Sequence, residues 1–157
     1  MLRRVSIACV FMAGSMGAAS GASLHYDATL SGGSEVPART GDATGHLLGT
    51  LDTVAKTFSY TVTFHALTGP ATMAHFHGPA AVGANAGVVV PLGKDPVSPI
   101  VGKVVLTDAQ IAELKAGKWY VNVHTVANPG WEIRGQMKAS DGPAMPPSMF
   151  GNGGKKS

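Results

Sequence analysis

Three histidines on two strand-like segments are the residues of this chain best suited to chemistry. His75 and His77 belong to Met-Ala-His-Phe-His-Gly (73–78), and His124 ends the run Trp-Tyr-Val-Asn-Val-His (119–124). Side chains two residues apart on a strand point the same way, with Cα atoms about 6.6 Å apart. If the two segments lie side by side, three imidazoles surround one point. Imidazole nitrogen suits copper, zinc, nickel and iron, so the pattern predicts a metal site with an open position.

Other interpretations of these residues remain open. His75 and His77 are also compatible with polar side chains at a sheet rim that bond to loops, with His124 as a satisfied strand histidine. His65 lies on the polar face of its own strand and is a candidate fourth ligand. The thioether of Met73 is a candidate soft ligand for copper, although methionine also serves as core filler.

Polar residues on neighbouring strands are candidates for a supporting role. Glu132, Arg134 and Gln136 alternate onto one face of the last strand. We expect a neighbouring carboxylate to hold Arg134 in a structural pair that fixes this strand against the preceding loop. The functional alternative is that Arg134 attracts an anion, such as superoxide or a carboxylate, towards the metal. Asn122 shares a face with His124, so we expect it to orient that imidazole by a hydrogen bond.

The segments that position these residues form an all-β pattern. Short alternating or β-branched runs are separated by glycine, proline and aspartate; they cover residues 24–30, 45–52, 56–64, 71–77, 87–92, 100–106, 118–125 and 132–138. Thr107 to Gln110 reads as a capping box that opens one short helix, which stops at Gly117. The pattern predicts about eight strands with one inserted helix, arranged as a Greek-key-like β-sandwich or a flattened barrel.

The two ends of the chain differ from this middle part. Residues 1–22 have the pattern of a signal peptide, residues 23–139 form the expected β domain, and residues 140–157 form a Gly/Pro-rich tail that we expect to be disordered. We therefore expect export to the periplasm or secretion. No second long apolar run follows the signal, so no membrane span is expected after its removal. The single cysteine, Cys9, lies in the signal, which excludes disulfides and thiolate ligands from the mature protein.

Charge and motif content exclude several classes of function. The formal charge of +3 includes Arg3 and Arg4 of the signal, and no basic stripe with interleaved aromatic residues is present, so we expect no nucleic-acid partner. The nine acidic residues are scattered, and the chain has neither a Gly-x-Ser-x-Gly elbow nor a phosphate-binding glycine loop. Hydrolase chemistry is therefore not predicted, and no catalytic residue is assigned.

Five motifs in order carry a resemblance to a known family. They are Ser-Glu-Val-Pro (34–37), Ala-His-Phe-His-Gly (74–78), Leu-Thr-Asp-Ala-Gln (106–110), Trp-Tyr-Val-Asn-Val-His-Thr (119–125) and Glu-Ile-Arg-Gly-Gln (132–136). Over roughly residues 24–139 the chain resembles the CHRD domain, first named from chordin. Trp131 stands where that family often has a glycine. The resemblance implies an extracellular binding module and supplies no reaction.

The His-x-His strand is also similar to the copper-ligand strand of copper/zinc superoxide dismutases, and this similarity favours copper. Residues 78–106 contain no histidine and only Asp95 as a carboxylate, so a separate zinc subsite has no ligands there. A copper-only superoxide dismutase-like activity is one alternative. The main hypothesis is an exported protein that binds copper for metal handling or redox protection. The second is a metal-free binding or matrix module that recognises an extracellular protein or a polysaccharide.

Overall fold

The computed structural model describes residues 23–142, and within them the chain forms nine strands, one 3₁₀ turn and one α-helix. The elements are β1 (Ser23–Ser31), η1 (Gly32–Ser34), β2 (Thr44–Asp52), β3 (Thr57–His65), β4 (Ala71–His77), β5 (Val88–Lys94), β6 (Ile100–Val105), α1 (Asp108–Lys115), β7 (Tyr120–Thr125), β8 (Ile133–Gln136) and β9 (Lys138–Ser140). The expected signal peptide lies outside the described residues. So does the expected tail, apart from residues 140–142, of which Ser140 closes β9.

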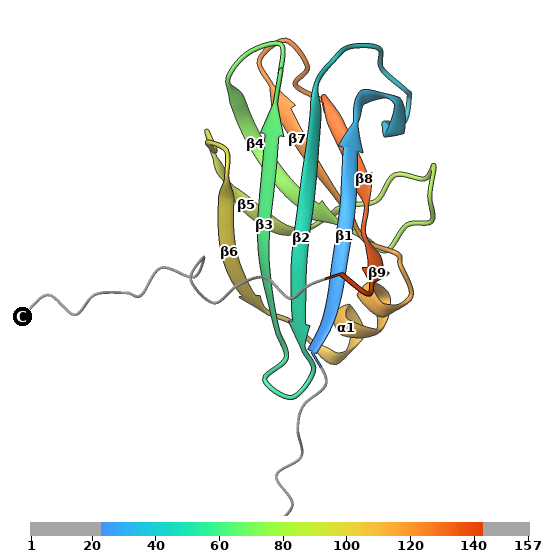
Figure 1. The fold of residues 1–157 in the computed structure, drawn as a ribbon. Helices are drawn as coiled ribbons and strands as arrows, with labels where there is room; N and C mark the ends of the chain where they lie inside the picture. Colours follow the sequence, from blue (N-terminus) through green and yellow to red (C-terminus); the bar gives the residue numbers. More distant parts are fainter. Residues whose placement is uncertain (1–22, 143–157) are drawn as a thin grey trace, which may run out of the picture.

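The strands form one antiparallel sheet that folds into two layers. Their order is β5-β4-β7-β8-β1-β2-β3-β6, and β9 pairs with β1. In Figure 1, β1, β2, β3 and β6 make the near layer, and β4, β5, β7 and β8 lie behind them. The contact between β8 and β1 is the pair Arg134 and Ser31, and it joins the layers on one side. The result is a nearly closed antiparallel barrel or sandwich, which confirms the predicted fold class.

The core lies between the two layers, and alternate side chains of strands such as β1 fill it. Tyr26, Ala28 and Leu30 of β1 are buried, while the residues between them are more accessible. Phe58 of β3 packs edge-on against Phe76 of β4, with 5.9 Å between ring centroids. Side chains on the inner face of a half-buried sheet are expected to alternate in this way.

Helix α1 begins and ends as its sequence predicts. The Thr107 hydroxyl accepts a hydrogen bond from the backbone N–H of Gln110, and the Gln110 side chain accepts one from the backbone N–H of Thr107. Leu114 is buried in the core. The helix stops before Gly117, whose φ of +67° is a left-handed conformation that glycine adopts without strain. Within the described residues no helix is long and apolar enough to cross a membrane.

The chain turns away from β4 directly after His77. A Cβ atom on Gly78 would lie 2.5 Å from Cδ1 of the buried Trp119, so only glycine fits there. Residues 79–87 then form a loop, which we call the cover loop, over the outer face of β7 and β8. Its backbone is held by the hydrogen bond from the Ala80 N–H to the Lys118 carbonyl. The outer face of this part of the sheet is therefore shielded from water by backbone.

Candidate metal centre

The two histidines of β4 point away from the core. Ala74 and Phe76 take the inner face of this strand, so His75 and His77 lie together on the outer face. β4 pairs with β7 in a register that sets His75 opposite Asn122 and Met73 opposite His124. His124 is therefore a diagonal neighbour of His75, a position from which cross-strand side chains make contact.

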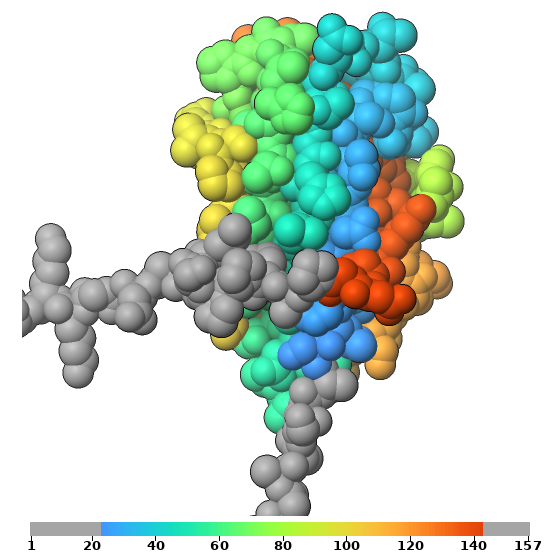
Figure 2. Space-filling view, in the orientation of Figure 1, coloured from blue at the N-terminus to red at the C-terminus, as the bar shows by residue number. Residues whose placement is uncertain are grey.

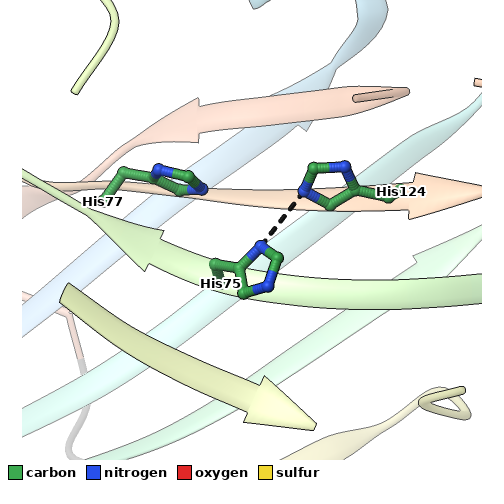
Figure 3. Close-up of side chains that lie close together, drawn as sticks. All are labelled: His75, His77 and His124. Atoms are coloured by element: carbon green, nitrogen blue, oxygen red, sulfur yellow. Dashed lines mark hydrogen bonds between the residues drawn. The ribbon is translucent and has the colours of Figure 1, made fainter. Parts of the chain in front are cut away.

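The three imidazoles converge. One ring nitrogen from each of His75, His77 and His124 lies within 4.8 Å of the corresponding nitrogens of the other two. Nδ1 of His75 is 3.1 Å from Nε2 of His124 (Figure 3). His77 and His124 are only 8% and 7% exposed, whereas His75 is half-buried. The structure thus brings together three of the four residues predicted as metal ligands.

Backbone carbonyls determine which nitrogen of two of these rings carries the proton. Nδ1 of His77 lies 3.0 Å from the carbonyl oxygen of Ala86, and Nδ1 of His124 lies 3.0 Å from that of Pro129. A carbonyl only accepts hydrogen bonds, so each Nδ1 is the donor and the Nε2 of a neutral ring keeps its lone pair. Metal-binding histidines are usually held in this way.

Burial also keeps the rings uncharged. Burial, together with the neighbouring His124 and His77, lowers the pKa of His75 to about 4, against a hydrogen bond with Asn122 that raises it. Burial likewise lowers the pKa of His124, although the hydrogen bond to Pro129 opposes the effect. Both rings are neutral at pH 7, which is the form that binds metal ions.

Asn122 contacts different histidines from the one expected. Its side-chain amide lies 3.0 Å from Nε2 of His77 and also bonds to His75, whereas Nδ1 of His124 is held by the Pro129 carbonyl. The register explains this, because Asn122 is directly opposite His75. The amide oxygen Oδ1 of Asn122 is the atom at Nε2 of His77, and a metal ion bound through this nitrogen would replace that contact.

Arg134 does not have the carboxylate partner that the sequence analysis expected. Among the described residues no carboxylate lies within ion-pair distance of it. Instead its guanidinium lies over the ring of Tyr120, 3.4 Å from the centroid, and donates to the Asn85 side chain and the Ala84 carbonyl. Tyr120 in turn stacks parallel to His77, with 4.8 Å between centroids. Tyr120 was not predicted as a site residue, although alternation places it on the same face as Asn122 and His124.

Glu132 holds a different part of the molecule. Its carboxylate accepts hydrogen bonds from the hydroxyls of Thr125 and Thr68 and from the backbone N–H of Thr68. Burial alone would raise its pKa, but these hydrogen bonds outweigh burial and lower the pKa. Glu132 therefore ties the end of β7 to the segment between β3 and β4.

His65 and Met73 have contrasting positions. His65 ends β3 in the other layer, where it is exposed and its Nε2 lies 2.8 Å from the Thr44 hydroxyl, so the structure does not bring it to the cluster. The register sets Met73 opposite His124, on the same face as His75. Met73 is 39% exposed and so is not the core filler that was the alternative.

Comparison with known proteins gives one match. The family model of the CHRD domain matches residues 26–137, which include all three clustered histidines and Arg134. Searches of curated proteins and of solved structures gave no match. The similarity to superoxide dismutases therefore rests on the His-x-His motif alone. The match covers more than half of the chain, and the chain belongs to the CHRD domain family.

Proposed function

We propose that this protein is an exported CHRD module that binds a metal ion, with copper favoured, through His75, His77 and His124, and that it serves in metal handling or redox protection. The observation that carries the proposal is the pair of carbonyl contacts at Ala86 and Pro129. They hold the Nδ1 side of two buried rings, and Nε2 of His124 lies 3.1 Å from Nδ1 of His75. Export is inferred from the signal-like sequence of residues 1–22.

The donor set favours copper on chemical grounds. The cluster consists of imidazoles, with no carboxylate and no thiolate among its described members. Nitrogen sites follow the Irving–Williams order, so Cu(II) binds such a set more tightly than Zn(II) does. Three nitrogens leave a coordination position open, as exchangeable and catalytic sites require. Because burial keeps His75 and His124 neutral, a metal ion competes with few protons at pH 7.

The test is a titration of the purified protein, without a histidine tag, with Cu(I), Cu(II) and Zn(II). We expect one equivalent of copper to bind, and His124→Ala to lower its affinity by a factor of about 100 or more, since one of three ligands is lost. His46→Ala is the matched control, because His46 is an exposed histidine on the outer face of β2. It should leave the affinity unchanged.

A titration in which the cluster histidine matters no more than a surface histidine would contradict the proposal. If His124→Ala and His46→Ala change copper binding to the same small extent, the metal proposal fails. The metal-free module that recognises an extracellular protein or a polysaccharide then becomes the working hypothesis. If copper binds at the cluster, a superoxide assay on the loaded protein and on His124→Ala tests the copper-only dismutase-like activity.

A further inference from the structure

A second cavity, separate from the histidine cluster, lies where the cover loop meets η1, β1 and β8. It has a volume of about 460 Å³, within the range of small-molecule sites. Its walls carry charged and polar side chains, chiefly Asp27, Glu35, Arg134, Gln136 and Lys138. The part of the cover loop that lines it, coloured yellow-green near residue 82, stands out beside β1 and β8 in Figure 2.

Two buried oxygens that belong to residues lining this cavity lack hydrogen-bond partners. Oε1 of Glu35 is buried and unpaired, and the whole residue is only 5% exposed. Oε1 of Gln136 is also buried and unpaired. The Gln136 amide cannot turn over to relieve this, because its nitrogen donates to the carbonyls of Ala80 and Gly117. Both orphan atoms are acceptors, so a group that satisfies them must bring donors.

The cavity also contains separated charges of opposite sign. Arg134 is 2% exposed and Glu35 is buried, yet neither has an ion-pair partner within the described residues. Arg134 is close enough to influence the Glu35 carboxyl electrostatically, without direct contact. A buried carboxylate without a charged partner is costly. An ammonium group would supply that partner to Glu35, and a carboxylate would complement the guanidinium of Arg134, which otherwise contacts Tyr120, Asn85 and Ala84.

We propose that this cavity binds a small zwitterion of the α-amino-acid type. The ligand's ammonium group donates to Oε1 of Glu35 and to Oε1 of Gln136. Its carboxylate faces Arg134, with Lys138 at the entrance, where this lysine is exposed. The site is independent of the metal, because none of the three histidines lines it.

The test is isothermal titration calorimetry, in which the purified protein is titrated with each of the twenty standard amino acids. For any that binds, two matched fragments are titrated: the amine that lacks the carboxylate and the acid that lacks the amino group. We expect at least one amino acid to bind, and both of its fragments to bind at least tenfold more weakly. Glucose serves as a neutral ligand rich in hydroxyl groups.

Variants separate the site from general effects on the fold. Glu35→Gln keeps the shape of the side chain and removes the charge, so it should weaken amino-acid binding at least tenfold. Asp42→Asn is the control, since it makes the same chemical change at an exposed residue outside this cavity, and His75→Ala should also leave binding intact. The proposal is overturned if no amino acid binds, if a fragment or glucose binds as well as the amino acid, or if Glu35→Gln binds normally.

Discussion

Burial of the Glu35 carboxyl, whose Oε1 has no hydrogen-bond partner, leads to a prediction about stability. Burial raises the pKa of Glu35 to about 7, although the charges of Arg134 and Arg39 and the backbone N–H of Val36 lower it. Asp27 and Lys138 are the other charged side chains that line its cavity. In the unfolded chain the same carboxyl has its ordinary value of 4.5. Between these two values the folded protein binds more protons than the unfolded chain, so its stability must fall as pH rises.

The size of this effect follows from the two pKa values. The difference between the folded and unfolded pKa values of Glu35 corresponds to about 3 kcal/mol of unfolding free energy if no solvent reaches the carboxyl group. Water in the adjoining cavity reduces it, and we expect about 2 kcal/mol. Glu35→Gln does not titrate. The free energy of unfolding of the variant should therefore rise relative to the wild type by this amount between pH 4 and pH 8, with most of the change between pH 4.5 and 7.

Urea unfolding of the metal-free wild type and Glu35→Gln at five pH values measures the difference. Taking the difference removes the contribution of groups that titrate alike in both proteins, including His75. Asp42→Asn makes the same chemical change at an exposed residue and is the control for this comparison. Parallel curves for Glu35→Gln would refute the reasoning. A free energy of unfolding of the wild type that rises relative to Glu35→Gln as pH increases would also refute it, because it would mean that a partner stabilises the folded carboxylate.

Three further predictions concern other parts of the structure. Gly78→Ala should destabilise the protein by about 1–3 kcal/mol in urea unfolding, since its Cβ would meet Trp119 at 2.5 Å. Thr107→Ala should cost about 1 kcal/mol in the same assay through loss of the helix cap. Met73→Leu should leave Zn(II) affinity unchanged and lower Cu(I) affinity by a factor of about 10, because a thioether is a soft ligand; competition titration measures both.

Each of these changes has its own control. Gly130→Ala is a suitable comparison for Gly78→Ala, because nothing lies within 4 Å of a Cβ at Gly130; equal losses would show that crowding is not the cause. Thr107→Ser keeps the capping hydroxyl and should recover most of the stability. A Met73→Leu protein that binds Cu(I) as tightly as the wild type would exclude the thioether from the metal site.

Much of the fold follows from local patterns in the sequence. Alternation of polar and apolar residues predicted a strand over residues 24–30, which lie in β1, and the Thr107 to Gln110 motif predicted the start of α1, because both signals depend on neighbours within a few residues. Spacing also put His75 and His77 on one face. Convergence of the three histidines was predicted on the condition that the two segments lie side by side, and the structure shows that β4 pairs with β7.

What could not be predicted depends on contacts between distant segments. The register of β8 on β7 sets Arg134 opposite Asn122, and its guanidinium stacks on Tyr120 instead of pairing with Glu132. The burial of Glu35 follows from the path of the chain around η1, where no periodic pattern exists. His65 was only a candidate fourth ligand, and the structure places its strand in the other layer, away from the cluster.

Many contacts on this face of the sheet are made by the backbone of the cover loop, which is why residue types in the sequence did not predict them. Its backbone carbonyls accept from His77 through Ala86, from Arg134 through Ala84 and from Gln136 through Ala80. Every residue has a backbone carbonyl group, so the identity of a residue does not indicate whether its carbonyl accepts one of these hydrogen bonds. The loop is rich in alanine and glycine, and such small residues allow a backbone to approach a sheet closely. The loop backbone, together with the side chain of Asn85, therefore positions groups at both the metal centre and the charged cavity.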